Sequence, residues 1–300
     1  MAGASLLMLL DDIAAILDDV SVMTKTAASK TAGVLGDDLA LNAQQVTGVL
    51  AKRELPVVWA VAKGSLLNKL ILVPSALVIN AFVPWLVVVL LMMGGLYLCY
   101  EGLEKVIHHF SHRRDHSPEA AKESIKKLEA GAVDEKAKIK GAVRTDFVLS
   151  AEIIVITLSV VAAQSLTTQI LVLSAIAVSM TVGVYGLVAL IVKLDDIGLY
   201  LSQRSGKGSQ KIGRLILQGA PYLMKGLTVV GTAAMFLVGG QILVHGIPAL
   251  SHGVEAILGK LGHYPEILAS LLFNGLFGMI AGALALAVVR GIAKLRKSTS

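Results

Sequence analysis

The stretch from residue 66 to residue 100 limits the fold of this chain more than any other feature of its sequence. It holds 35 residues, and Lys69 is its only formally charged side chain. One membrane helix needs about 20 apolar residues to cross about 30 Å of hydrocarbon, so this stretch is too long for one crossing and short for two. Pro74 and Pro84 each remove a backbone N–H donor from a helix. We therefore expect a proline-broken helical hairpin that turns at residues 80–84, either as two full crossings or as a re-entrant hairpin.

The composition indicates that lipid is the solvent for much of the chain. Of its 300 residues, 55% are hydrophobic and only 16% are charged, whereas soluble domains carry about 25% charged residues. Four further apolar segments follow the hairpin, at residues 147–163, 170–192, 222–245 and 267–289. The net charge of +6 comes from Lys and Arg in loops beside the apolar segments, without an aromatic and basic platform. The expected partner is the lipid bilayer, and nucleic acid is not expected.

The distribution of Lys and Arg predicts how the chain crosses the membrane. Four regions hold six, ten, five and four of these residues, namely residues 1–69, 101–146, 193–214 and 290–300. The short connections between the later segments hold none or one of them. Basic loops stay on the cytoplasmic side, so the N-terminal region and the loop after the hairpin both lie inside only if the hairpin crosses twice. We expect six membrane segments with both termini cytoplasmic.

The expected fold is all-α: a polytopic helical membrane bundle of about six membrane segments, including the hairpin, with an N-terminal amphipathic helix. Residues 4–24 repeat apolar side chains at helical spacing, and residues 25–56 read as short helices and turns. We expect one integral membrane domain over residues 1–300. Its parts are a cytoplasmic amphipathic and polar region (1–65), the hairpin (66–100), a basic cytoplasmic loop (101–146), four further spans (147–289) and a cytoplasmic tail (290–300).

Pairs of aspartates form an acidic stripe on the N-terminal helix. The pair Asp11 and Asp12 is repeated seven residues further on, which places both pairs on one helical face. Such a face could bind a cation or a basic loop, but charge runs are usually solvated, and we favour a solvated face. A similar Leu-Asp-Asp-Ile sequence contains Asp195 and Asp196. Paired halves are common in transporters, although chance explains so short an echo, and these four aspartates are our candidates for an ion or polar-cavity site.

Glu152 is the charge best placed for a function inside the membrane. It lies in the short apolar segment 147–163, and a charge within lipid is costly, so it is a functional candidate by default. Its carboxyl could carry a proton or bind a cation. It could equally pair with Lys225 or reach the lipid headgroups, and the sequence does not decide between these roles.

Three histidines have the spacing of metal ligands. His108, His112 and His116 lie four residues apart, so they would share one face of a helix, and imidazoles at i and i+4 can share a metal. No His-Glu-x-x-His pattern accompanies them, and Pro118 ends the run. We favour a polar helix end at the membrane surface over a metal site.

Gly275, Gly278 and Gly282 place small residues along one side of the last apolar segment. Such a face allows close helix contact, either within one bundle or between subunits. Packing within the bundle is the expected role, and a homo-oligomer through these glycines is the alternative.

The sequence contains no recognisable catalytic pattern. A nucleophile elbow, a phosphate loop and a dinucleotide fingerprint are all absent from it. Its single cysteine, Cys99, excludes an intrachain disulfide. We therefore expect neither an enzyme nor a cofactor.

Three stretches of the chain carry a resemblance to a known family: MAGASLLMLLDDIAAILDDVSVMTKTAASKTAGVLGDDLALNAQQVTGV, then RELPVVWAVAKGSLLNKLILVP, and later MMGGLYLCYEGLEKVIHH. They resemble the bacterial YedI-type inner-membrane family. The resemblance implies an integral protein of the bacterial inner (plasma) membrane that forms one domain over most of the chain. That family is classed as a domain of unknown function, so the resemblance carries over no catalytic or binding residue.

Three functions fit these features. The leading expectation is a transporter or channel for ions or small solutes, because prolines break the hairpin and charges lie at membrane boundaries. The alternative is a non-transporting scaffold or regulatory protein that docks partners through the acidic helix and the basic loop. A metal-dependent membrane enzyme that uses the histidines is the third.

Overall fold

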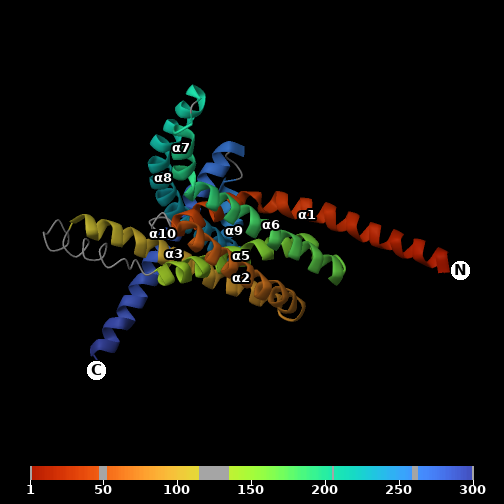
Figure 1. Cartoon of the computed structure of the whole chain (residues 1–300). Helices are drawn as coiled ribbons and strands as arrows, with labels where there is room; N and C mark the ends of the chain where they lie inside the picture. Colours follow the sequence, from red (N-terminus) through yellow and green to blue (C-terminus); the bar gives the residue numbers. More distant parts are fainter. Residues whose placement is uncertain (1, 47–52, 115–134, 205, 259–262, 299–300) are drawn as a thin grey trace.

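The computed structural model describes residues 2–46, 53–114, 135–204, 206–258 and 263–298, and every regular element within them is an α-helix (Figure 1). The long helices in these ranges are α1 (Ala2–Val46), α2 (Glu54–Phe82), α3 (Pro84–Arg114), α5 (Glu135–Val161), α6 (Leu166–Val192), α8 (Lys207–Gly246) and α10 (His263–Ser298). Two short helices, α7 (Leu194–Ser202) and α9 (Pro248–Leu258), follow α6 and α8. The prediction of an all-α fold is confirmed.

Much of the outer surface of the bundle is apolar. Within the described residues, five helical segments are long and apolar enough to cross a membrane: Glu54–Phe82, Pro84–Ile107, Leu166–Val192, Lys207–Gly246 and Pro265–Ile292. Their outer faces carry large apolar side chains such as Leu70, Val182 and Leu272, which are 64%, 69% and 66% exposed. Soluble monomers rarely leave large apolar patches open to water. These faces indicate a multi-pass membrane protein.

The predicted hairpin is present. Helix α2 ends at Phe82 and α3 begins at Pro84, with Val83 between them. The N–H of Val83 closes the last turn of α2 by donating to the carbonyl of Ile79 at 2.7 Å, and Pro84 has no N–H with which to continue that helix. Pro74 lies within α2 without ending it. Both arms extend beyond the apolar stretch, and at about 1.5 Å per residue each is long enough for a full crossing.

Helix α1 is longer than the sequence predicted. Residues 25–46 were expected to form short helices and turns, and this expectation is wrong because they continue α1 as one helix. The segment is rich in Ala and Leu, which are good helix formers. It also buries one side against α5, α6 and α8, including Ala27, Thr31, Asp38 and Leu41 at helical spacing. The glycines and polar residues of this segment favour turns locally, but packing against the other helices keeps it helical.

The helices form two groups that share an interface. One group holds α1, α2, α5 and α6, and the other holds α3, α8 and α10. Two neighbouring residues of α1 join the groups by polar contacts. Gln44 donates to Thr232 Oγ1 of α8 at 2.8 Å, and Gln45 donates to Glu101 Oε1 of α3 at 3.1 Å.

Helix α1 runs the full height of its own group. At one end, Ala43 and Val46 pack with the first turns of α2, the first half of α5 and the end of α6. Towards the other end, Ala27 packs with the second half of α5 and the first half of α6. Helix α1 is therefore parallel to α6 and antiparallel to α5. Its N-terminal part projects beyond the rest of the bundle (Figure 1).

Helix α5 contains the remaining predicted membrane segment, 147–163, but it is less apolar than the five segments above. Arg144, Asp146 and Glu152 lie in or next to its apolar part. Arg144 is exposed, whereas the two acidic side chains are buried. They are buried because α1, α2, α3 and α6 pack around α5. The two acidic side chains of this segment therefore face protein rather than lipid.

The glycine stripe of α10 packs within the chain. A Cβ added to Gly278 would lie 2.2 Å from the carbonyl oxygen of Phe236 in α8, and one added to Gly282 would lie 2.4 Å from the carbonyl oxygen of Cys99 in α3. A Cβ on Gly275 would meet the side chain of Leu237 of α8 at 3.2 Å. Within the chain this stripe gives α10 close contact with α8 and α3, and a homo-oligomer stays a prediction.

Candidate functional site

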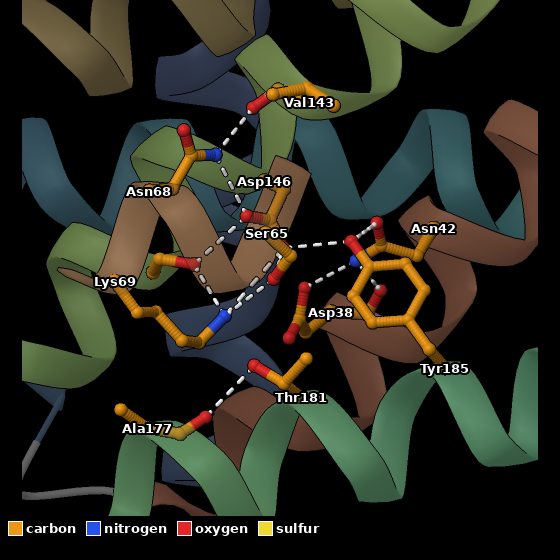
Figure 2. A network of polar contacts seen from close by, with 11 residues as sticks. Asp38, Asn42, Ser65, Asn68, Lys69, Val143, Asp146, Ala177, Thr181 and Tyr185 are labelled. Atoms are coloured by element: carbon orange, nitrogen blue, oxygen red, sulfur yellow. Dashed lines mark hydrogen bonds and ion pairs between the residues drawn. The ribbon is translucent and has the colours of Figure 1, made fainter. Parts of the chain in front are cut away.

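A lysine and an aspartate form a buried ion pair between α2 and α5. Lys69 is 2% exposed and Asp146 is 1% exposed, and Lys69 Nζ lies 3.8 Å from Asp146 Oδ1 (Figure 2). Moving such charges out of water costs on the order of several kcal/mol per ion. The pair therefore depends on the other polar groups around it.

Two serines connect the charged partners. Ser65 Oγ accepts a hydrogen bond from Lys69 Nζ at 2.7 Å and donates one to Asp146 Oδ1 at 2.8 Å. Ser150 Oγ accepts from Lys69 Nζ at 2.8 Å and donates to Asp146 Oδ2 at 3.1 Å. Each serine lies four residues from the charged residue of its own helix, so the two share a helical face. Lysine and aspartate are thus linked directly and through two hydroxyl groups.

The Asp146 carboxylate accepts two further hydrogen bonds. Asn68 Nδ2 donates to Oδ2 at 3.0 Å, and the Tyr185 hydroxyl of α6 donates to Oδ1 at 2.8 Å. With the two serines, this makes four donors, and an ionised carboxylate offers about four acceptor positions. The four donors therefore fill the acceptor positions of both carboxylate oxygens of Asp146.

Tyr185 extends the network to α1. Its hydroxyl oxygen also lies 2.8 Å from Asn42 Oδ1, and Asn42 Nδ2 donates to Asp38 Oδ1 at 2.6 Å (Figure 2). A hydroxyl carries one proton, so Tyr185 can donate to Asp146 or to Asn42 but not to both at once. The bonds join Asp38 of α1 to Lys69 of α2 through α6 and α5. We call Asp38, Asn42, Ser65, Asn68, Lys69, Asp146, Ser150 and Tyr185 the buried polar network.

Glu152 lies on the same helix as Asp146 but outside the hydrogen bonds of this network. It is 6% exposed, and its Oε2 atom has no hydrogen-bond partner among the described residues. The charges that act on it are the carboxylates of Asp37 and Asp38 on α1. Lys225, which the sequence offered as a partner, is exposed on α8. Glu152 is thus a buried acid whose neighbouring charges have its own sign.

The other sequence-predicted site residues do not join the network. Asp195 and Asp196 are exposed in the first turn of α7, where Asp196 pairs with Lys193. The side chains of Asp11 and Asp12 fall outside the described residues, as do His116 and the side chains of the other two predicted histidines. In the part of the chain that the structure describes, no three His, Cys, Asp or Glu side chains are grouped so that they could hold a metal ion.

Sequence reasoning did not identify Lys69 and Asp146 as site residues. Lys69 was noted only as the one charge of the long apolar stretch, and Asp146 only as the last residue of the basic loop 101–146. A signal was present, because Ser65 with Lys69 and Asp146 with Ser150 are both polar pairs at i and i+4 in apolar surroundings. Such pairs mark one helix face as polar, but they do not say which helix it meets.

An ion pair closes the end of the bundle nearest the first turns of α2 and α5. Arg53 Nη2 donates to Glu135 Oε1 at 2.8 Å, and Arg53 Nε donates to Glu135 Oε2 at 3.1 Å. This two-point hydrogen bond from Arg53 holds the pKa of Glu135 below its usual value. This exposed pair joins the N-terminal ends of the two helices that carry the Lys69–Asp146 pair.

Comparison with known proteins identifies a family but no activity. A family model described as "Protein of unknown function (DUF808)" matches residues 4–288. No curated protein and no solved structure matches the chain. The expectation of an unknown-function family over most of the chain is confirmed, while its YedI-type naming stays a prediction. The chain belongs to DUF808, a family of proteins of unknown function.

Proposed function

We propose that this protein is a transporter of ions or small solutes in the bacterial inner membrane, with the buried polar network as its working centre. The observation that carries the proposal is the Lys69–Asp146 pair. Replacing a buried ion pair by apolar residues of similar volume is often neutral or stabilising, so such a pair is not needed for folding alone. Ionisable residues inside membrane proteins commonly mark ion and substrate pathways.

The arrangement of hydrogen bonds supports a site that can change state. The Tyr185 proton has two alternative acceptors, Asp146 and Asn42, at the same distance of 2.8 Å. Turning the O–H from Asp146 to Asn42 removes one hydrogen bond from the counter-ion of Lys69 without requiring a helix to move. A transport cycle needs such alternative states of similar energy.

We also propose an orientation for the chain. The basic loops and the C-terminus lie in the cytoplasm, because Lys and Arg are enriched there in membrane proteins. Helix α1 adds a crossing to the six predicted ones, which moves the N-terminus to the outside. The packing of α1 along the height of α5 and α6 supports this, and residues 1–24 contain no Lys or Arg. Trp59 and Trp85 are exposed near opposite ends of the hairpin and suit the two membrane interfaces.

The outward face of α1 supports a water-filled entrance beside the network. Thr26, Ser29 and Lys30 are exposed on this face. Placing them against hydrocarbon would be costly, so we place this face towards water. Asp37, which is half-buried, lies two turns further along α1 and next in sequence to Asp38 of the network.

Flux measurements on purified protein in liposomes test the transport proposal. We expect a panel of ions and small solutes to include at least one that produces charge movement or uptake with the wild-type protein. Asp146→Asn should abolish this flux, because the neutral amide leaves Lys69 without its counter-ion. Asp195→Asn is the matched control, since Asp195 is an exposed aspartate of α7, and its flux should equal that of the wild type.

Two results would contradict the proposal. One is correctly folded wild-type protein that moves nothing in the whole panel. The other is a Lys69→Met/Asp146→Leu protein that folds and transports as well as the wild type, because the pair would then have no part in transport.

The N-terminal part of α1 favours the scaffold as a second candidate function. Ile13, Leu17 and Val22 are 45%, 60% and 53% exposed on the projecting part of α1. An exposed apolar face of this kind can bind a partner protein. Crosslinking in native membranes, with and without residues 2–19, tests this: a partner that is lost with the deletion supports the scaffold, and the absence of any stoichiometric partner argues against it.

A further inference from the structure

We propose that Glu152 is a proton-binding site inside the bundle, and that it supplies the coupling proton of transport, a role that rests on the proposed function above. Two observations support this site: Glu152 is buried, and its Oε2 atom has no hydrogen-bond partner in the described ranges. A carboxylate buried without a partner is strongly disfavoured relative to the neutral acid.

The charges around Glu152 do not balance. The charges that act on Glu152 are those of Asp37 and Asp38 on α1. Lys69 of α2 and Asp146 of α5, in the same group of helices, pair with each other. Tyr185 is the titratable group on α6. Asp146 is compensated by Lys69 and four hydrogen bonds, and Asp38 receives one from Asn42. Glu152 is therefore a buried acid that faces charges of its own sign and has one carboxyl oxygen without a hydrogen-bond partner among the described residues.

A proton fits this site better than a metal cation does. Alkali and alkaline-earth ions in proteins are held by about six or more oxygen ligands. No grouping of acidic side chains suitable for a metal occurs in the described residues. A proton needs only one carboxylate oxygen, which Glu152 offers.

The three carboxylates differ in how deeply they are buried. Asp37 is half-buried, and a Cβ added to its neighbour Gly36 would meet no described atom within 4 Å, so the bundle surface is open at this point of α1. Asp38 and Glu152 are buried. Asp37 is thus the acid of this part of α1 closest to the surface, and Asp38 is connected to Tyr185 through Asn42.

Infrared spectroscopy of the full-length protein in nanodiscs tests the proton site without requiring flux. Wild-type protein near neutral pH should show the C=O stretch of a protonated carboxyl, and ¹³C labelling of the glutamate carboxyls should shift it. The band should be missing in Glu152→Gln and kept in Glu104→Gln, which removes an exposed glutamate of α3. If Glu152→Gln does not fold, the labelled wild type alone still decides whether a glutamate is protonated.

Three outcomes would overturn the proposal. The first is no glutamate band in the wild type at any pH at which it is folded, and the second is a band that persists in Glu152→Gln. The third is a band that disappears when Na⁺ or K⁺ is raised at constant pH, which would assign the site to a metal cation.

A liposome assay tests the coupling role separately. Wild-type flux should respond to a pH gradient, whereas Glu152→Gln should keep the flux driven by the solute gradient and lose that response. A wild-type flux that ignores the pH gradient removes the coupling role but not transport. Absence of all flux with the infrared band present counts against transport and leaves the proton site in place.

Discussion

Lys69 of α2 and Asp146 of α5 lie 3.8 Å apart at nearly zero exposure, and Ser65 and Ser150 each bond to both of them. Two charges and two hydroxyls thus form a closed unit between parallel faces of two helices. Loss of one charge should destabilise this unit, because the other charge is then buried without a counter-ion. Loss of both charges should be tolerated, because no unpaired charge remains.

The first prediction follows from this asymmetry. Asp146→Ala should lower the free energy of unfolding by about 3–5 kcal/mol, since it leaves Lys69 buried and unpaired. Lys69→Met/Asp146→Leu should be close to the wild type. Thermal unfolding in detergent measures both. If the double variant is as unstable as Asp146→Ala, the loss of stability comes from the hydrogen bonds of the serines and Asn68 rather than from an unpaired charge. Arg53→Gln, at the exposed pair, is the control and should change little.

The second prediction concerns the hydroxyl of Tyr185. Tyr185→Phe keeps the ring and removes the proton that bonds to Asp146 or Asn42. The loss of a hydrogen bond to a charged group should cost about 1.5–3 kcal/mol of stability. The same variant should slow transport more than its stability loss explains, because Asp38 is then disconnected from Asp146. Unchanged flux in folded protein would remove Tyr185 from the transport route.

The third prediction concerns the glycines of α10. Gly278→Ala should destabilise the protein by about 1–3 kcal/mol, because the new methyl group would meet the backbone of Phe236. Gly226→Ala in α8 is the control, since its Cβ would meet nothing described within 4 Å. It should be neutral or stabilising by up to about 1 kcal/mol, as Ala favours helix over Gly. Equal effects of the two changes, measured by thermal unfolding, would contradict the close packing of α10 on α8.

The fourth prediction tests the orientation of α1. In a protein with Cys99 replaced by Ala, single cysteines placed at Asp19, Ser165 and Arg204 report their sides by reaction with a membrane-impermeant maleimide. We expect the first two to react in intact spheroplasts and the third only after lysis, because α1 begins on the side of the α5–α6 turn. Reaction of the first only after lysis would place the N-terminus in the cytoplasm.

The local features of this protein can be predicted from its amino-acid sequence alone. Long apolar stretches, helix-breaking prolines and loop charges act over a few neighbouring residues, so the all-α fold and the break before Pro84 could be predicted from it. Glu152 also stood out as an acid flanked by apolar residues on a short span, but its burial depended on the helices that pack around α5. The extent of α1 could not be predicted, since its last turns are helical through packing on α5, α6 and α8.

Which polar groups contact one another depends on how the helices pack. Lys69 and Asp146 are far apart in sequence, and in a membrane protein apolar periodicity does not distinguish a face towards lipid from a face towards another helix. The same holds for Tyr185, which reads as one aromatic in an apolar helix until α1 and α5 are placed beside it. The contacts between helices thus turn a set of isolated polar residues into one network, and they leave Glu152 next to charges of its own sign.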